Sequence, residues 1–458
     1  MEPLWAAMVG AHGALAMAFD AAVPTPYMDE VFHVRMAQAY CALRLDEWDA
    51  KVTTFPGLYI VASAAAHVAS GVGRLLGAGG VRPSVLCRLR NLRAINALAG
   101  ALVPVACYRL LRVRHPRAGR ATVALNALAM ALVPASFFFH FLFYTDTIAT
   151  LLVLLGLLCT QRRAFEAAAA PLAVAVSIRQ TNAVWALFAL CVAAIDATDA
   201  VARAARVHAG STGSLVSEVS WRVRALARLE PRALVRLAPL GAIVGSFAIF
   251  VVVNGGVVVG DRSHHVPGLH FAQVLYACAF CACFGDPAKF TTHGPSTVRA
   301  LGSRARAHPR VAAAALALAL GAVRWGTMCH PFLLADNRHY TFYVWKDLLR
   351  RPVVRYGAAL GYVPCAALVW DALGEQSALW RLAFVGCSAL VLVPSPLLEL
   401  RYFALPFLVL RLHAPLLTGA RELVPALALS AGVNALTIGV FLLRPWRWPD
   451  GSEARFIW

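Results

Sequence analysis

Two adjacent carboxylates, Asp29 and Glu30, open the part of the sequence that is densest in groups able to transfer a proton. His33 and the acidic stretch 46–49 follow in the same segment. Because neighbouring side chains cannot face the same way on a helix or strand, one carboxylate can point into a cavity while the other anchors the chain. A carboxylate at the rim of a cavity is a candidate general base. The alternative is a solvated loop acid without a chemical role.

A second polar segment, residues 330–346, combines charge with aromatic rings. In it, Arg338 and His339 stand directly before Tyr340 and further aromatic residues. A planar guanidinium binds two phosphate oxygens at once, and aromatic rings stack on sugars or hold a segment at the membrane surface. The segment therefore predicts a site for a phosphate or another anionic headgroup. A snorkelling arginine within an interfacial aromatic belt is the alternative.

Three further polar strings stand at the ends of apolar runs: residues 179–182, 254–265 and 399–402. Arg179 and Arg401, in the first and third strings, compete with Arg338 for the role of binding a phosphate. The pair Gly255–Gly256 lacks the Lys and Ser or Thr of a nucleotide-binding loop. It therefore favours a turn or helix-packing element.

The eleven cysteines are scattered, mostly inside apolar runs, and carry no clear signal. Cys278, Cys281 and Cys283 have the spacing of a metal cluster, but the apolar run 271–284 offers no nearby carboxylate. Small hydrophobic residues are the better interpretation of these three. The sequence also lacks an H-E-x-x-H motif, so it predicts neither a metal nor a cofactor.

The composition is that of a membrane protein, since 60% of the residues are hydrophobic, 14% are charged and the mean hydropathy is +0.66. Soluble domains are roughly 45–50% apolar and about 25% charged. The apolar residues come in runs such as 121–139 and 237–259, close to the roughly 20 residues that span a bilayer. The net charge of +19 comes mainly from arginines in short loops, the pattern of the positive-inside rule, so membrane lipid and not nucleic acid is the expected partner. These features predict an all-α, polytopic integral membrane protein.

Basic loops alternate along the chain with loops that carry acids, His, Asn and aromatics, and this alternation predicts a topology. The basic loops face the cytosol and the mixed loops face the opposite, luminal side. The first apolar run, 4–23, is a retained span and not a cleaved signal. We expect a single transmembrane domain, residues 1–458, with about thirteen spans and a luminal C-terminus. The later spans lie near 92–111, 121–139, 147–160, 164–177, 183–195, 237–256, 268–284, 311–328, 355–371, 379–394, 402–416 and 424–443.

Two regions are predicted to lie on the membrane surface. Residues 24–91 form a large first luminal loop, in which 56–73 is a surface helix, because a span there would move every later loop to the other side. Residues 196–236 are rich in Ala and Arg and form a cytosolic amphipathic loop. Since the acids and bases lie at one face in large loops and not within spans, an enzyme acting on an amphiphile is favoured over a transporter.

Several strings resemble one enzyme family, the dolichyl-phosphate-glucose-dependent α-1,2-glucosyltransferases of the endoplasmic reticulum. They are YMDEVFHVRMAQAYC (27–41), WDAKVTTFPGLY (48–59), RQTNAVW (179–185), VVVNGGVVVGDRSHH (251–265), LLADNRHYTFYVWK (333–346), LLELRYF (397–403) and RFIW (455–458). Enzymes of this family add the third and last glucose to the lipid-linked oligosaccharide used for N-glycosylation. The family belongs to the GT-C class of multi-span glycosyltransferases, which use dolichyl-phosphate sugars in the lumen.

The resemblance implies a GT-C-type helical fold with an acidic motif in the first luminal loop, at Asp29 and Glu30, and surface helices before the second span. Phe55 departs from the family pattern, which tends to have Pro there. The implied donor is dolichyl-phosphate glucose, the implied acceptor is the diglucosylated dolichyl-diphosphate oligosaccharide, and the reaction inverts the sugar. The implied location is the endoplasmic reticulum membrane, with a luminal active site.

The resemblance also implies roles for individual residues. Asp29 is the expected base, and Glu30 orients the loop or the acceptor. The expected donor-phosphate residues are Arg338, His339, Arg179, Arg401 and Tyr340. The expected acceptor-binding residues are Trp48, Asp146, Asp261 and Asp336. A transferase with a mannose donor, a transporter and a non-catalytic membrane subunit are the alternatives.

Overall fold

The computed structural model describes residues 2–77, 81–204, 215–263 and 266–457, and within these ranges the only sheet is one two-stranded hairpin. Nearly all remaining regular structure is helical, so the predicted all-α class is confirmed. The chain forms two compact units. Unit 1 comprises residues 1–114 and 139–265, and unit 2 comprises residues 115–138 and 266–458.

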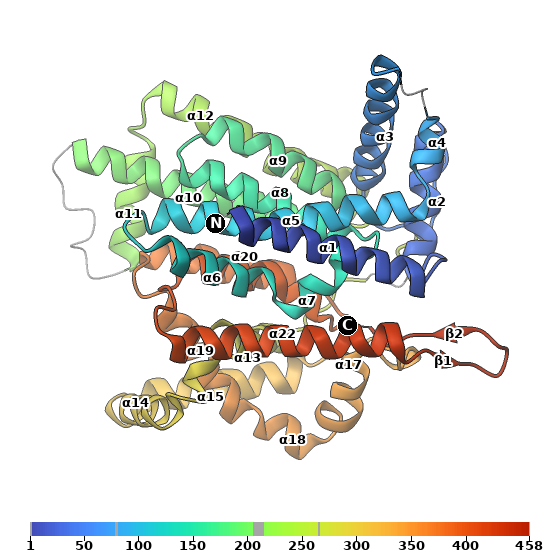
Figure 1. Cartoon of the computed structure of the whole chain (residues 1–458). Helices are drawn as coiled ribbons and strands as arrows, with labels where there is room; N and C mark the ends of the chain where they lie inside the picture. The colour runs from blue at the N-terminus through green and yellow to red at the C-terminus, as the bar shows by residue number, and fades with distance from the viewer. Residues whose placement is uncertain (1, 78–80, 205–214, 264–265, 458) are drawn as a thin grey trace. The chain divides into compact units, whose positions relative to one another are not determined.

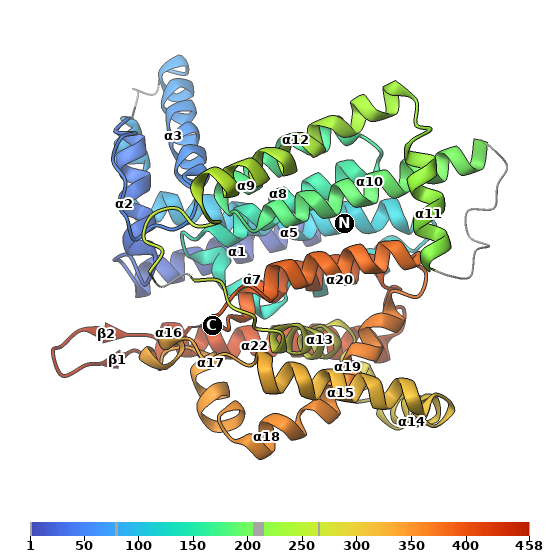
Figure 2. The ribbon, with the colours of Figure 1, turned by 180° about the vertical axis from the view of Figure 1, so that it is seen from behind.

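Unit 1 is built on a layer of long apolar helices (Figure 1). Its helices are α1 (Glu2–Ala22), α2 (Glu30–Cys41), α3 (Gly57–Leu75), α4 (Pro83–Leu86), α5 (Leu89–Arg114), α8 (Thr145–Gln161), α9 (Phe165–Ile178), α10 (Asn182–Ala204), α11 (Leu215–Leu226) and α12 (Pro231–Asn254). The helix α8 packs between α5 and α9, α1 packs on α5, and α12 packs on α9 and α10. Figures 1 and 2 show that these helices run in a common direction and that α2 and α3 run across it.

Unit 2 is likewise helical, with the short helix η1 (Phe138–Phe141) beginning at its boundary with unit 1. Its elements are α6 (Arg120–Ala131), α7 (Pro134–Phe137), α13 (Ala272–Gly285), η2 (Pro287–Lys289), α14 (Gly294–Ala307), α15 (Pro309–Gly326), α16 (Pro331–Ala335), α17 (Tyr340–Tyr343), η3 (Val344–Leu349), α18 (Pro352–Gly357), α19 (Ala359–Ala372), α20 (Ala378–Leu392), η4 (Leu400–Phe403), α21 (Ala404–His413), α22 (Ala420–Leu443), β1 (Trp446–Arg447) and β2 (Glu453–Ala454). The helix α13 packs against α15, α19, α20 and α21, and α22 packs against α6 and α7.

Prolines and glycines set many of the helix ends. Six of the described α-helices begin with proline, whose missing N–H would be unpaired in the first turn: Pro83, Pro134, Pro231, Pro309, Pro331 and Pro352. The helix α12 ends at Gly255, which has a φ of 69° and so adopts the left-handed conformation that glycine favours. The Asn254 side chain donates to the carbonyl of Gly256 at 2.8 Å. The pair Gly255–Gly256 is therefore a helix-end turn, as its sequence predicts.

The described residues contain six helices that are long and apolar enough to cross a membrane by length and composition. They are Gly57–Leu75, Leu89–Arg114, Asn182–Val201, Pro231–Asn254, Pro352–Ala372 and Ala420–Leu443. Four shorter apolar helices, α8, α9, α13 and α20, coincide with further predicted spans. The predicted span 121–139 is not one straight helix, because the chain bends by 65° between Ala131 and Pro134. The chain is thus a multi-pass membrane protein, and the count of about thirteen spans stays a prediction.

The helix α3 covers the predicted surface helix 56–73 and has two different faces. Leu58, Tyr59 and Ala62 are fully buried, on the side where α3 packs against α2. Exposed apolar side chains line the other face: Ile60, Val68, Val72 and Leu75. An exposed apolar face needs a cover, and lipid is the cover that a membrane protein offers.

The predicted amphipathic loop 196–236 is described only in part, since residues 205–214 lie outside the described ranges. The helix α10 continues into this loop, and α11 and the start of α12 form its second half. Arg222 joins α11 to α10 by donating to Asp199 at 2.8 Å, and it also donates to Glu218 of its own helix at 3.2 Å.

Candidate active site

The acidic motif lies at the start of α2, where the backbone makes an unusual turn. Met28 has a φ of 56°, in the left-handed region that residues with side chains rarely adopt. Asp29 follows as the residue that caps α2, and Glu30 is the first residue of the helix. Such a conformation persists only where surrounding contacts enforce it, and it is common at functional sites. The turn sends the two neighbouring carboxylates into different surroundings.

Glu30 is completely buried and forms an ion pair with Arg93, which is also completely buried. Arg93 Nε lies 2.9 Å from Glu30 Oε1, and Arg93 Nη2 lies 2.6 Å from Glu30 Oε2. The backbone N–H groups of Tyr27 and Phe143 donate to the same carboxylate at 3.0 and 2.6 Å. Three of these hydrogen bonds tie the first loop to α5 and to the segment before α8, and the fourth lies within the loop. This position fits the role of orienting the loop, and it leaves Glu30 no access to a substrate.

Asp29 lies outside this buried network and is half-buried. Its backbone N–H donates to the Tyr144 hydroxyl at 3.1 Å. His33 lies one turn further along α2, on the same face, and its Nδ1 lies 2.8 Å from the Tyr59 hydroxyl. The His33 ring also lies against the ring of Tyr144, with 6.0 Å between centroids. Asp29 is therefore part of a polar and aromatic cluster that α2, α3 and the start of α8 build together.

A buried asparagine positions Tyr144 within this cluster. The Asn96 amide donates to the carbonyls of Leu142 and Tyr144 at 2.6 and 2.8 Å. The sequence analysis singled out neither Asn96 nor Arg93, because nothing marks a polar residue at the start of an apolar run as a partner of a distant loop. Tyr59 and Tyr144 were also missed as site residues, although Tyr59 ends the string 48–59 and Tyr144 stands two residues before Asp146.

Arg179 and Asp146 form an ion pair in unit 1, between the end of α9 and the first turn of α8. Both are largely buried, with side-chain exposures of 18% and 14%. Next to Arg179, the Gln180 amide donates to the carbonyl of Thr53 at 2.9 Å. These contacts attach the RQTN string to the first loop. Asp146 is therefore held by a cation, and both residues lie on the same part of unit 1 as the acidic motif.

Of the two other residues expected to bind the acceptor in unit 1, Trp48 lies in the first loop and Asp261 contacts it. Trp48 stacks at a tilt on Tyr59, with 6.3 Å between ring centroids, and is 37% exposed. Asp261 is exposed, and its backbone N–H donates to the carbonyl of Ala50 at 2.7 Å. A side chain at Gly260 would collide with the carbonyl oxygens of Ala50 and Val52 in the loop. Asp29, Glu30 and Trp48 thus lie in the first loop, Asp261 is hydrogen-bonded to it, and Gln180 beside Arg179 donates to it.

Unit 2 carries the segment with Arg338, His339 and Asp336. Arg338 binds both oxygens of Asp336 with its side chain, at 2.8 and 2.7 Å, and donates its backbone N–H at 2.9 Å. His339 Nε2 lies 3.5 Å from the same carboxylate. Partial burial raises the pKa of Asp336, but hydrogen bonds from His339 and Arg338 outweigh it and hold the pKa well below its ordinary value. The Asp336 carboxylate therefore orients the side chains of Arg338 and His339.

The remaining candidates in unit 2 are similarly fixed. The Tyr340 hydroxyl lies 3.0 Å from Thr437 Oγ1 of α22. Arg401 pairs with Glu399, two residues before it, and lies over the Tyr402 ring at 5.9 Å. Each of the three arginines expected at the donor phosphate thus has a carboxylate partner, which fixes the plane of its guanidinium. A phosphate bound there would share the guanidinium with that carboxylate.

The cysteines divide into one disulfide and free thiols. Cys41 at the end of α2 is bonded to Cys87 just after α4, which corrects the expectation that the cysteines carry no signal. Within the described ranges, no group of three or more His, Cys, Asp and Glu side chains could hold a metal ion. Cys278, Cys281 and Cys283 are free thiols on α13.

Fold and site together define an all-α, multi-pass membrane protein with polar groups gathered on loops at helix ends. The chain belongs to the DIE2/ALG10 family, whose profile matches residues 23–412.

Several relatives match nearly the full length of the chain, and they share one name. A protein of Rattus norvegicus, named Dol-P-Glc:Glc(2)Man(9)GlcNAc(2)-PP-Dol alpha-1,2-glucosyltransferase, is 35% identical, and the match covers 97% of this chain and 95% of the relative. Proteins of the same name from Homo sapiens and Arabidopsis thaliana are 32% and 31% identical. Those matches cover 97% and 95% of this chain and 95% of each relative. No solved structure matches the chain.

Proposed function

We propose that this chain is an inverting glucosyltransferase that moves glucose from dolichyl-phosphate glucose to the diglucosylated, dolichyl-diphosphate-linked oligosaccharide, forming an α-1,2 bond. The names of the nearly full-length relatives support this donor and acceptor. Within this chain, the proposal is supported by the different surroundings of Asp29 and Glu30. One carboxylate is locked in a buried ion pair, and its neighbour is left half-buried on a rigid turn.

Asp29 acts as the general base. One oxygen of its carboxylate accepts the proton of the acceptor hydroxyl while that hydroxyl oxygen attacks the anomeric carbon of glucose from the face opposite the phosphate. The bond between the anomeric carbon and the phosphate oxygen breaks, and dolichyl phosphate leaves with the electron pair. A single displacement of this kind inverts the anomeric centre. The hydrogen bond from the Asp29 backbone to Tyr144 fixes the base, which reduces the cost of reaching the reactive geometry.

Cationic side chains stabilise the leaving phosphate. The phosphate gains negative charge as the sugar departs, so a cation beside it acts more on the transition state than on the ground state. Arg338 and His339 are the first candidates because Asp336 already holds both in one orientation. Arg179, held by Asp146, and Arg401 are the competitors. Trp48 and Asp261 contribute to acceptor binding at the first loop.

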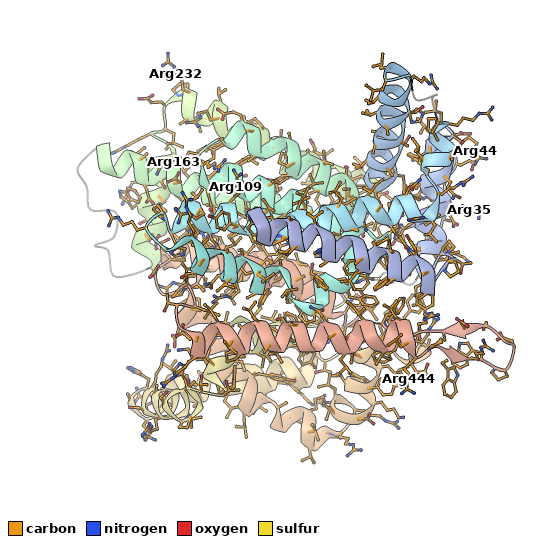
Figure 3. The ribbon with its side chains drawn as sticks, viewed as in Figure 1. Arg35, Arg44, Arg109, Arg163, Arg232 and Arg444 are labelled. Carbon is orange, nitrogen blue, oxygen red and sulfur yellow. A yellow bond between two sulfur atoms is a disulfide. The ribbon has the colours of Figure 1, made fainter. Side chains whose placement is uncertain are left out.

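The active site faces the lumen of the endoplasmic reticulum. In unit 1, Arg163 and Arg232 of the predicted cytosolic loops lie at one end of the long helices, and Arg35 and Arg44 lie at the other end (Figure 3). Arg44 is balanced by Glu47 at 3.1 Å, so the second end carries mixed charge. The positive-inside rule puts the basic end in the cytosol. The disulfide Cys41–Cys87 within the loop 24–91 agrees, because disulfides persist in oxidising compartments.

The first luminal loop lies on the membrane surface. Its helix α3 runs across the long helices of unit 1 (Figure 1) and exposes an apolar face, as expected of a helix resting on lipid. On this topology the loop 196–236 lies at the cytosolic face, and about thirteen spans connect the loops. Residues 1–458 then form one membrane-embedded protein that binds its lipid-linked donor and acceptor at the headgroup level.

The direct test uses the purified protein in detergent with a diglucosylated lipid-linked acceptor and each donor in turn. We expect a triglucosylated product with dolichyl-phosphate glucose and none with dolichyl-phosphate mannose. Product formed only with the mannose donor would replace glucose by mannose in the proposal. Failure to form product with either donor, from a protein that is folded, would favour a transporter or a non-catalytic subunit.

A further inference from the structure

The segment after α22 turns back and contacts the polar segment around Arg338. Beyond Leu443 the chain forms the hairpin β1–β2, with Trp446 paired to Ala454. Figure 1 shows this hairpin extending from the end of α22. Its first strand is exposed, whereas Arg455 and Ile457, after the second strand, are 7% and 2% exposed. The part that turns back, residues 455–457, is therefore buried in unit 2 although it has no regular secondary structure of its own.

Arg455 attaches this segment to the end of α22. Its Nη1 donates to the carbonyls of Phe441 and Leu442 at 2.8 and 3.0 Å. The last carbonyls of a helix have no partner within the helix, so a buried arginine that binds two of them is a strong cap. The guanidinium also lies 5.9 Å from the Phe441 ring and 3.2 Å from the Glu453 carboxylate. These contacts determine where the next two residues lie.

Ile457 and Phe456 contact the Arg338 segment directly. The backbone N–H of Ile457 donates to the carbonyl of Arg338 at 2.8 Å, and Ile457 forms a parallel bridge with His339. The Phe456 ring meets the Tyr340 ring edge-on, with 4.5 Å between centroids. It also lies 6.0 Å from the ring of Tyr343. The backbone of the Arg338 segment and its aromatic side chains thus rest on residues 456 and 457.

Asp336 and Ile457 bind different groups of Arg338. Asp336 holds the guanidinium and the backbone N–H, while Ile457 holds the backbone carbonyl. Thr437 of α22 holds the Tyr340 hydroxyl at 3.0 Å. Since Arg455 is bound to the same helix, α22 is the common support for the whole arrangement.

We infer that Arg455, Phe456 and Ile457 are positioning residues for the reaction: they fix Arg338 and His339 where the donor phosphate binds. The inference rests on the proposed role of Arg338 at the donor phosphate. None of the three touches the reacting atoms, so they act through the Arg338 segment. A guanidinium displaced by about 1 Å loses much of its effect on a transition state. Contacts that set its backbone therefore matter for rate.

The test is a double-mutant cycle between the two segments. Ile457→Pro removes the N–H that donates to Arg338, and Ile457→Val keeps it. Arg455→Gln removes the cationic cap, and Arg455→Lys keeps the charge. We expect Ile457→Pro and Arg455→Gln each to lower kcat/KM for dolichyl-phosphate glucose by about tenfold or more, with the KM for the acceptor unchanged. Ile457→Val and Arg455→Lys should recover most of the loss.

Each loss should largely vanish when Arg338 is already Lys, because residues that act through one group are not additive. Arg306→Gln, an exposed arginine of α14, is the matched control and should behave like the parent. The inference would be overturned if the losses in kcat/KM of Arg455→Gln and Ile457→Pro add in full to the loss of Arg338→Lys. Parent-like kinetics of both Arg455→Gln and Ile457→Pro would also overturn it. If Ile457→Pro does not fold, the cycle with Arg455→Gln decides. Parent-like activity of Arg338→Lys itself would instead refute the proposed phosphate role.

Discussion

The backbone N–H of Asp29 donates to the hydroxyl of Tyr144 across 3.1 Å and joins residues 115 positions apart in the sequence. The carbonyl of Tyr144 accepts in turn from the buried Asn96 of α5 at 2.8 Å. The proposed base is thus connected through two hydrogen bonds to one of the long apolar helices. A loop residue would otherwise sample many positions, and these bonds restrict it to one.

Replacing the proposed base should remove most of the activity and leave the fold intact. Asp29→Asn keeps the size of the side chain but cannot accept the proton, and a general base contributes about 10²- to 10⁴-fold. We expect kcat to fall by that factor with the melting temperature in detergent unchanged. Asp46→Asn, an exposed acid of the same loop, is the control and should be neutral. Turnover of Asp29→Asn within a few-fold of the parent would remove Asp29 from the mechanism.

The neighbouring carboxylate should show the reverse pattern. Glu30→Gln removes the buried carboxylate that pairs with Arg93 and leaves Asp20, at 3.3 Å, as the carboxylate that still pairs with the cation. Breaking a buried ion pair costs about 3–5 kcal/mol. We expect a clearly lower melting temperature, with near-normal turnover by the fraction that remains folded. A variant that melts like the parent but does not turn over would make Glu30 part of the chemistry.

The arginine expected at the donor phosphate can be tested with a charge-conserving change. Arg338→Lys keeps the charge but loses the planar fork that binds two oxygens. We expect the rate to fall by about tenfold or more, with the melting temperature little changed. The rates of Arg179→Lys and Arg401→Lys, measured in parallel, show which of these two arginines matters more for the reaction. A lowered melting temperature with near-normal turnover for Arg338→Lys would make it a structural residue and move the phosphate role to whichever competitor loses rate.

The disulfide predicts a dependence on reductant. The bond Cys41–Cys87 joins the last residue of α2 to the end of a segment that contains α3 and α4, and losing a native disulfide typically costs about 2–5 kcal/mol. Cys41→Ser should therefore lower the melting temperature, and reductant should lower that of the parent to a similar value. The exposed thiol variant Cys283→Ser is the control and should keep the response to reductant. A parent protein whose melting is indifferent to reductant would argue against this bond.

The reaction is expected to proceed in the presence of a chelator. Cationic side chains can neutralise a leaving phosphate without a metal, and the sequence holds no metal motif. We expect kcat in EDTA to match kcat in its absence. Loss of activity in EDTA that magnesium or manganese restores would show that a divalent ion takes part.

Much of the fold follows from the sequence because long apolar runs leave few alternatives to a helix in a membrane. The runs near 92–111 and 424–443 are helices in the structure, and the glycine pair at 255–256 ends one. The break before Pro134 was missed, although proline cannot continue a helix without losing a hydrogen bond.

The site was predictable only in part. The divergence of Asp29 and Glu30 follows from the geometry of neighbouring residues, but the choice of which one is buried depends on Arg93, 63 positions further along. Cys41 and Cys87 are likewise separated by 46 positions and share no local pattern. Pairings over such distances depend on how helices pack, and a single sequence does not record that packing.

The ion pair between Arg93 and Glu30 has a consequence for the way the chain is made. Arg93 stands near the start of α5, a helix that is apolar enough to enter the bilayer, and a charged side chain there is costly until it is paired. Its partners, Glu30, Asp20 and the carbonyl of Val23, all emerge from the ribosome before it. The helix α5 should therefore be released into lipid together with α1, as a preassembled pair. A newly made chain with a defective first loop could not pair Arg93. The translocation machinery would then retain that chain when α5 is inserted.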